Sequence, residues 1–376
     1  MRTILRYIAV LLAAALVFGA ARLMDAAPWR NAKKEAASDA ETAAMVQPET
    51  QPSQTEVTAI QTDSATQPES LPQTQPSEER FLLTFVGDCT LGGRDAQAYA
   101  GHGFPLTVGE DYGFPFRNVL EYFETDEMTF LNLEGVFCET KYSDPKAQTF
   151  RGPVSYVNIL SESSVEAVSL ANNHTMDYGQ EGYASTVNAL EEAGISYAER
   201  DTAAVFTTKN GLTIGIYGAV YSKMDTDVIT EAIRQLREQV DILIFAPHWG
   251  VKMSALQNQE QTDLAHAVME AGADIIWGSH PQVLQPMEQY NGGRIFYSLG
   301  CFSFGGNMNP KDYDSALIQQ EVIRSAGGSV SLGETIVVPV CISSVSDRNN
   351  YQPTPYEEGS EGYVRVLEKL ALAEKN

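Results

Sequence analysis

The stretch SLANNHTMDYG, residues 169–179, marks the point where a buried strand is expected to end in a polar site. The apolar run 165–171 predicts this strand, and two asparagines, His174 and Asp177 follow it. Amide, imidazole and carboxylate groups at the carboxyl end of a strand are poor material for a hydrophobic core. They are typical of a site that presents ligands to a metal or a substrate.

Four other apolar runs lead in the same way into polar side chains beside Gly or Pro. The five expected strand ends supply Asp88 after 81–86, Glu134 after 128–133, Asn173 and His174 after 165–171, His248 after 241–246, and His280 after 273–277. A lone Asp before a turn is usually a cap, and a lone His near a strand is usually structural. Three of the five histidines lie at such ends, so we expect one shared site; His102 and His266 are assigned surface or packing roles.

Helices are expected to alternate with these strands, which predicts a layered α/β architecture with the site at the strand ends. Amphipathic periodicity indicates helices over 180–193, 229–240, 258–270 and 361–373. Further strands are expected at 203–208 and 212–217, which form a hairpin, and at 294–299, 316–322 and 329–338.

The N-terminal eighty residues have a different composition from the rest of the chain. Residues 1–25 carry two arginines and then an apolar run, which indicates a retained signal-anchor or, alternatively, a cleaved signal peptide. Residues 26–79, rich in Gln, Thr, Pro and Ser, predict a disordered stalk. Residues 80–376 are then the folded domain, held outside the cell membrane by the anchor, or secreted if the signal is cleaved.

Charge and cysteine content exclude some function classes. With 25 basic against 49 acidic residues, the formal charge of −24 argues against nucleic acid as a partner. A phosphate substrate is still compatible if bound cations supply local positive charge. The four cysteines show no zinc-knot or dense disulfide spacing, so we expect buried packing thiols, with one disulfide left open.

The donor types at the strand ends point to metal chemistry. Carboxylate, amide and imidazole ligands together suit Mn²⁺, Fe or Zn²⁺. Phosphoryl transfer at a two-metal centre needs a bridging carboxylate and a general acid for the leaving group. His174, oriented by Asp177, fits the role of the general acid.

Six ordered motifs then resemble a known family. GDCTLG, NLEG, ANNHTMDYG, PHWG, GSHPQVLQPME and YSLGCFSFGG are similar to the CapA-type poly-gamma-glutamate capsule-synthesis proteins of the calcineurin-like metallophosphoesterase superfamily. The resemblance implies a metallophosphatase-like four-layer α/β/β/α sandwich. It implies that Glu134 bridges two metals, with Asn173, His248 and His280 completing one site, Asp88 belonging to the other, and His174 acting near the leaving group.

Three positions depart from the family pattern. Gln282 stands where a second metal-binding histidine is usual, Lys252 replaces a glutamate, and Cys301 replaces an asparagine. A glutamine amide is a weaker ligand than imidazole for Zn²⁺-like ions. The metal site of Asp88 and Gln282 is therefore expected to be weak, to take a harder ion, or to be empty, which gives one or two ions in all.

Two functions from different classes follow. The first is a cell-surface metal-dependent phosphoesterase-type hydrolase in the biosynthesis of an anionic envelope polymer. The second is a non-catalytic, metal-retaining binding or assembly component that works with other capsule-synthesis proteins. A metal-free solute receptor is a more distant third.

Overall fold

The computed structural model describes residues 78–95, 100–140, 148–220 and 225–371. The chain divides into two compact units, Met1–Glu69 and Ser70–Asn376, and the described residues all belong to the second. The predicted anchor and most of the predicted stalk lie outside the described residues. Within them, no helix combines the length and the apolar character needed to span a membrane.

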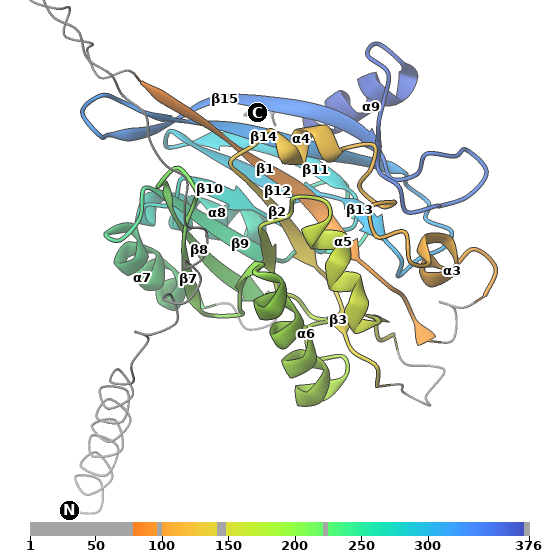
Figure 1. Cartoon of the computed structure of the whole chain (residues 1–376). Coiled ribbons are helices and arrows are strands. Elements are labelled where there is room, and N and C mark those ends of the chain that lie inside the picture. The colour runs from red at the N-terminus through yellow and green to blue at the C-terminus, as the bar shows by residue number, and fades with distance from the viewer. Residues whose placement is uncertain (1–77, 96–99, 141–147, 221–224, 372–376) are drawn as a thin grey trace, which may run out of the picture. The chain divides into compact units, whose positions relative to one another are not determined.

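Two mixed β-sheets form the centre of this unit (Figure 1). The larger sheet has the strand order β16-β15-β14-β1-β2-β5-β6, with β13 paired to β1. Its strands are β1 (Glu79–Thr90), β2 (Met128–Leu133), β5 (Ala167–Ser169), β6 (Ser196–Ala198), β13 (Cys301–Phe304), β14 (Asp314–Arg324), β15 (Val330–Cys341) and β16 (Thr354–Pro355). The run β1, β2, β5 and β6 is parallel, so these strands end at one edge.

The smaller sheet has the order β11-β12-β10-β9-β8-β7. Its strands are β7 (Ala203–Thr207), β8 (Thr213–Val220), β9 (Ile242–His248), β10 (Ile275–Trp277), β11 (Leu284–Tyr290) and β12 (Gly293–Leu299). Strands β8, β9, β10 and β12 are parallel, and β7 pairs with β8 as the predicted antiparallel hairpin. A separate two-stranded parallel ladder joins β3 (Val136–Phe137) and β4 (Arg151–Gly152).

Helices pack on the outer face of each sheet. The helical segments are α3 (Phe104–Val108), α4 (Leu120–Glu124), η1 (Val154–Tyr156), α5 (Val157–Ser161), α6 (Gly179–Ala193), α7 (Thr226–Arg237), α8 (Gln259–Ala271) and α9 (Glu361–Leu370). Sequence caps explain the ends of the longer ones. Asn258 and Gln261 form a capping box at the start of α8, and Gly194 ends α6 in the left-handed conformation.

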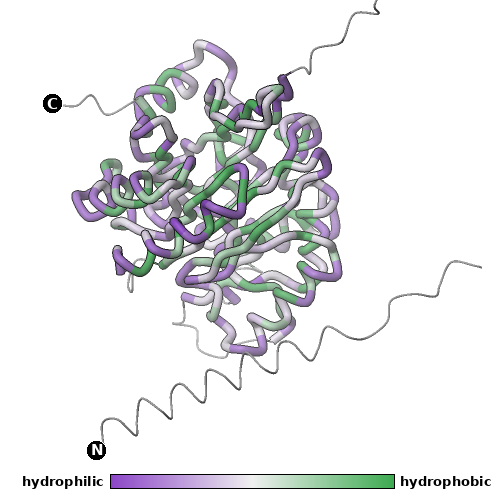
Figure 2. The backbone as a smooth tube through the Cα atoms, turned by 90° about the vertical axis from the view of Figure 1, so that its left-hand side faces the viewer, coloured by the Kyte–Doolittle hydropathy of each residue, from purple (hydrophilic) through white to green (hydrophobic). Residues whose placement is uncertain are grey.

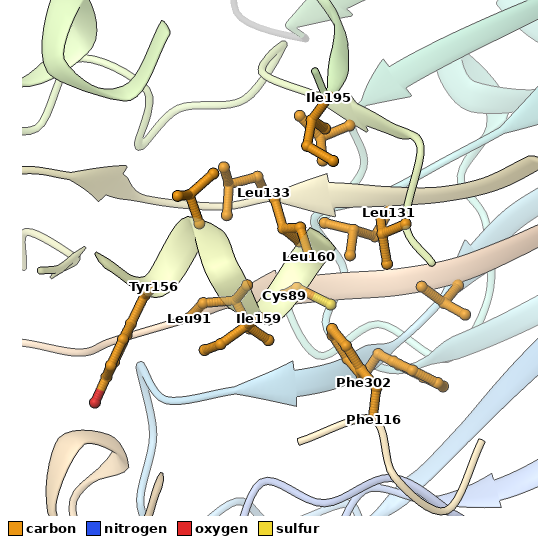
Figure 3. Packing of buried hydrophobic residues seen from close by; sticks show 14 of the residues in the cluster. Cys89, Leu91, Phe116, Leu131, Leu133, Tyr156, Ile159, Leu160, Ile195 and Phe302 are labelled. Carbon is orange, nitrogen blue, oxygen red and sulfur yellow. The ribbon is translucent and has the colours of Figure 1, made fainter. Parts of the chain in front are cut away.

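Three hydrophobic clusters hold the layers together. Residues of both sheets meet between them, including Phe85 and Phe130 of the larger sheet and Ile244 of the smaller. A second cluster packs the larger sheet against α5 and α6, and Figure 3 shows Leu160 of α5 close to Leu131 and Leu133 of β2. A third packs the smaller sheet against α7 and α8. The hydropathy colouring of Figure 2 accordingly shows green strand segments inside and purple loops outside. The predicted α/β class is confirmed.

Several expected strand ends were wrong in detail. Asp88 lies inside β1 and not beyond it, because the strand continues through Gly87 and pairs Asp88 with Asn132 and with Cys301. Gly87 permits this pairing, since a Cβ there would lie 2.0 Å from the carbonyl oxygen of Gly300. Strand β9 likewise runs on to His248, because the last residues of β8 continue to pair with it.

The lengths of other elements also differ from expectation. The run 165–171 forms only the three-residue strand β5, whereas the C-terminal strands 316–322 and 329–338 extend to 314–324 and 330–341. Helix α9 ends at Leu370. The sequence patterns did not predict the short elements α3, α4, α5, β6 and β13, nor strand β11.

The cysteines match their predicted packing role. All four are free thiols, and Cys89, Cys138 and Cys301 are buried while Cys341 is half-buried. The disulfide left open by the sequence does not form. Burial raises the pKa of the Cys89 and Cys301 thiols, which keeps them protonated.

Candidate functional site

The acidic part of the site joins the two sheets. Oδ1 of Asp88 accepts a hydrogen bond of 2.8 Å from the side-chain amide of Asn132, one strand away. Oδ2 accepts one of 3.2 Å from the backbone N–H of His280, in the loop after β10. Burial raises the pKa of Asp88 to about 6, although both hydrogen bonds and the charge of Lys252 lower it.

Glu134 follows β2 and is almost fully buried. Burial, followed by the nearby charge of Asp88, raises its pKa well above the usual value, while Lys252 and a hydrogen bond from the Gln282 side chain lower it. Its Oε2 atom has no hydrogen-bond partner among the described residues. A buried carboxylate oxygen without a partner costs free energy unless a proton or cation binds it. The donor set at Glu134 therefore fits a bound metal ion.

The imidazole part of the site brings three ligand-type atoms together. Nε2 of His248 lies 2.7 Å from Oδ1 of Asn173 and 3.1 Å from Nδ1 of His280. Nδ1 of His248 contacts the hydroxyl of Ser279 at 2.9 Å. If Nδ1 carries the proton and donates to Ser279, the Nε2 lone pair faces Asn173 and His280, as in a metal-binding histidine.

Electrostatics keep these two imidazoles neutral. Burial, and then the neighbouring rings of His280 and His174, lower the pKa of His248 well below its usual value. Burial also lowers the pKa of His280, with Lys252 and His174 acting in the same direction. Neutral imidazole is the form that binds a metal.

The loop after β10 adopts unusual backbone conformations. His280 has a φ of 96° and Gln282 a φ of 60°, both in the region that side-chain-bearing residues seldom adopt. Such strain persists where surrounding contacts fix the backbone, and it is common at functional sites. Here it accompanies the placement of the His280 backbone N–H on Asp88.

His174 forms the third part of the site. Its Nδ1 lies 2.7 Å from Oδ2 of Asp177, and its Nε2 lies 3.5 Å from Oε1 of Glu134. The ring of Phe150 lies beside it, tilted by 31°, with a centroid separation of 4.2 Å. The backbone N–H of Phe150 also donates to Oδ2 of Asp177 at 2.6 Å, which fixes that carboxylate. His174 is thus an oriented imidazole directed at Glu134.

The structure brings the eight predicted site residues together in two groups of contacts, which the sequence neighbours Asn173 and His174 join. In the first group Asp88 is linked to His280, His280 to His248, and His248 to Asn173. In the second, Glu134 is linked to His174 and Gln282, and His174 to Asp177. Among the described residues, no three His, Cys, Asp or Glu side chains form an ion site by themselves. The predicted ligand set contains four such side chains, Asp88, Glu134, His248 and His280, so three of them are not gathered around one ion position here, and the ligand roles stay predictions.

Four supporting residues were not assigned from the sequence. Asn172 donates to the side-chain oxygen of Asn132 and to the carbonyl of Leu133, while its own Oδ1 accepts from the His174 N–H. Ser279 orients His248, and Phe150 packs on His174. Asn132, Asn172 and Ser279 occur within the quoted motifs, but nothing in the sequence around Phe150 indicates its place.

His102 and His266 lie apart from these contacts, as predicted. Nε2 of His102 contacts the carbonyl of Met308 at 3.2 Å. The ring of His266 stacks on Tyr290 at a centroid separation of 3.8 Å, and its Nε2 lies 2.9 Å from Glu288. Both act in packing.

Comparison of the sequence with known protein families identifies one family. Residues 82–305 match the model of the bacterial capsule synthesis protein family PGA_cap. The chain belongs to this family. The matched range contains every residue of the site, and the resemblance to CapA-type proteins is confirmed.

Two curated relatives show how far the similarity extends. The capsule biosynthesis protein CapA of Bacillus anthracis is 31% identical over 281 residues, which cover 67% of this PGA_cap chain and 66% of the relative. The PGA biosynthesis protein CapA of Bacillus subtilis (strain 168) is 31% identical over 282 residues, covering 64% of this chain and 70% of the relative. The chain therefore spans about two thirds of the length of these relatives.

Similarity to solved structures is weaker. A putative 5'-nucleotidase from Staphylococcus aureus, solved with alpha-ketoglutarate, covers 77% of this PGA_cap chain and 58% of its own chain. Its TM-score is 0.44 at 12% sequence identity.

Proposed function

We propose that the chain is a cell-surface, metal-dependent phosphoesterase-type hydrolase that acts in the biosynthesis of a poly-gamma-glutamate-like capsule polymer. The observation that carries the proposal is the unpartnered Oε2 of buried Glu134, with the His174–Asp177 pair beside it. A carboxylate prepared for a cation and an oriented imidazole are the two groups that hydrolysis at a metal centre requires.

The cation would be held between Glu134 and the neighbouring group of Asn173, His248 and His280. Glu134, Asn173, His248 and His280 offer a carboxylate oxygen, an amide oxygen and two neutral imidazole nitrogens, a set that suits Mn²⁺, Fe or Zn²⁺. Asp88 and Gln282 offer a second, weaker set of oxygen donors. Lewis-acid polarisation of the scissile group is the chemistry that a divalent ion would supply here.

The proton chemistry belongs to His174. Asp177 accepts from Nδ1, so the proton at Nε2 is directed toward the side of Glu134, where a leaving oxygen would lie. Donation from Nε2 neutralises that oxygen as its bond breaks, and Asp177 stabilises the charged imidazolium before donation. The Phe150 ring covers one face of the imidazole and keeps it in this orientation.

The names of the relatives support the assignment of a poly-gamma-glutamate-like polymer. Both are named for capsule or PGA biosynthesis, so we assign the same process to this chain, together with partner proteins of that process. The predicted N-terminal anchor would place the domain outside the membrane. A metallophosphatase-like sandwich agrees with two sheets that have helices on their outer faces.

Hydrolysis of a small phosphodiester by the full chain tests the enzymatic proposal. We expect activity that is lost on chelation, restored by Mn²⁺ or Zn²⁺, and reduced by a factor of about 10² or more in His174→Ala. Glu181→Gln, a change on the exposed side of α6, serves as the matched control and should leave the rate unchanged. Full activity after chelation or in His174→Ala would refute a metal-dependent hydrolase.

A second function is favoured by the positions of the three family departures. Lys252, Gln282 and Cys301 line the same cavity beside the site. Their clustering agrees with a centre that has lost one metal and acts as a binding or assembly component. That function predicts polymer or partner binding that survives His174→Ala in a chain without hydrolase activity.

A further inference from the structure

Two adjoining cavities open beside the candidate metal centre. One, of about 230 Å³, is lined by Gln282 and Cys301 among others, and the second, of about 290 Å³, by Arg94 and Phe150. Four residues line both cavities: Lys252, Phe304, Asn307 and Asn309. The two cavities therefore form one groove, with Lys252 at the junction.

Basic residues without carboxylate partners gather in this groove. In the described part of the chain most arginines and lysines form ion pairs with Asp or Glu. The exceptions are Arg94, Lys209, Lys252, Arg294 and Lys311. Three of these five, Arg94, Lys252 and Lys311, line the two cavities. We call the two joined cavities with these three residues the basic groove. Three unpaired cations close together give this groove a local positive charge that attracts an anion, although the whole chain carries a charge of −24.

The fold holds the Lys252 loop against the site. The backbone N–H of Met253 donates to the carbonyl of Pro281 at 2.8 Å, between the two strained residues of the His280 loop. The side-chain amide of Gln285 also donates to the carbonyl of Ser254 at 3.0 Å. Lys252 is thereby placed where its charge acts on both Asp88 and Glu134.

Arg94 lies at the end of the groove nearest His174. Its guanidinium carbon is 5.8 Å from the centroid of the Phe150 ring, the same ring that lies beside His174. Its Nε atom is buried without a hydrogen-bond partner among the described residues, and one Nη atom has only a long contact of 3.4 Å to Gln148. These N–H groups remain available to a ligand anion.

The other lining residues narrow the class of ligand. Amides of Asn307 and Asn309 can hydrogen-bond to amide groups, and Phe304 and Ile342 offer apolar contact to methylene groups. Asp312 is the acidic residue that lines the cavity of Gln282 and Cys301. Its charge is neutralised by Lys369, whose Nζ lies 2.8 Å from Oδ2 of Asp312. A free phosphate ion would use the cations but neither the amides nor the apolar walls.

We propose that the basic groove is a binding site for a linear polycarboxylate with amide linkages, whose successive carboxylates lie on Lys311, Lys252 and Arg94. The chain would reach His174 at the Arg94 end. This inference rests on the proposed function for the identity of the polymer, but binding in the groove does not require hydrolysis.

Calorimetric binding of a short γ-linked glutamate oligomer to the full chain tests the groove, with chelator present so that no turnover occurs. We expect binding that weakens with salt and falls at least about fivefold in each of Lys252→Gln and Arg94→Gln. Arg234→Gln, which removes the same charge from the exposed surface of α7, is the matched control and should bind as the parent does. Inorganic phosphate is the second probe and should compete only weakly.

The outcomes separate this inference from the proposed function. The proposed binding site would be refuted if the parent and both groove variants bound the oligomer with equal affinity. It would also be refuted if Arg234→Gln weakened oligomer binding as much as the groove variants do. Tight, Lys252-dependent binding of phosphate without oligomer binding would overturn the polycarboxylate. Lys252-dependent oligomer binding in a chain without hydrolase activity would uphold the groove and refute the hydrolase. Activity on a phosphodiester without oligomer binding would uphold the hydrolase and refute the groove.

Discussion

Nδ1 of His174 lies 2.7 Å from Oδ2 of Asp177, and that same oxygen accepts the backbone N–H of Phe150 at 2.6 Å. Asp177 thus fixes both the imidazole and the segment whose aromatic ring covers it. Because the two contacts share one carboxylate oxygen, the orientation of His174 is coupled to the position of Phe150. The proton-transfer group of the site is therefore built from two loops that are distant in sequence.

Asp177→Asn tests whether this orientation matters for catalysis. An amide at position 177 stabilises the imidazolium less than a carboxylate does, so we expect the rate to fall about 10-fold to 100-fold while the metal content is unchanged. Phosphodiester turnover, measured together with the metal content per chain, checks the prediction. Glu181→Gln again controls for the loss of one charge, and an unaltered rate in Asp177→Asn would contradict the role of Asp177.

Gln282→His tests the second metal site. Imidazole is a stronger ligand than the glutamine amide for Zn²⁺-like ions, so we expect the variant to bind more metal per chain than the parent. Metal content of the purified full chain, measured by mass spectrometry, gives the answer directly. Gln289→His, at an exposed position of β11, controls for unspecific binding by an added histidine. Two ions already present in the parent chain would show that Gln282 is an adequate ligand.

Much of the site could be predicted from the sequence because its residues follow strongly apolar strands. Glu134, Asn173 and His280 each come within a few residues of a buried strand, and parallel strands bring such ends to one edge. Asp88 and His248 lie inside their strands instead. Continued pairing with β2 and β8 extends these strands. The sequence of one strand does not indicate how far its neighbours pair with it, so these strand ends could not be predicted.

The residues that sequence reasoning missed depend on long-range contacts. Phe150 reaches His174 because its segment pairs with β3, and Ser279 reaches the ring of His248 across the adjacent strands β9 and β10. Short elements such as α5 also lack the periodicity that marks a helix, since five residues form little more than one turn. Tertiary packing against the larger sheet stabilises them.

Phe85→Ala tests the core between the sheets. Phe85 is fully buried and stacks on Phe130 with a centroid separation of 5.1 Å, in contact with Trp277 of the smaller sheet. Removal of the ring leaves a cavity between the two sheets, which are held apart by their other core residues and cannot move together to fill it. We therefore expect a loss of about 3–5 kcal/mol in the free energy of unfolding. Urea denaturation measures it. Phe85→Leu should lose less, and equal losses in both variants would argue against a cavity as the cause.

Asp126, at the end of the sheets away from the site, predicts a pH dependence of stability. It is 5% exposed, and burial raises its pKa to about 7, although hydrogen bonds from Thr84 and Thr129 lower it in part. A carboxyl whose pKa is higher in the folded state binds a proton more tightly there than in the unfolded chain. Its contribution to stability is full below the unfolded pKa near 3.8 and is lost as the pH rises through about 7.

Asp126→Asn should remove this dependence. The amide carries no charge to bury, and its oxygen can still accept from the Thr129 hydroxyl, which lies 2.7 Å from Asp126 in the parent. We expect the variant to be more stable than the parent at pH 8, with little difference at pH 4, because the parent carboxyl is protonated in the acid range. Urea denaturation between pH 4 and 8, with chelator present to exclude metal effects, measures the difference. Glu124→Gln, at an exposed position near the end of α4, is the control, and a parent-like pH profile in Asp126→Asn would show that Asp126 stays ionised in the folded chain.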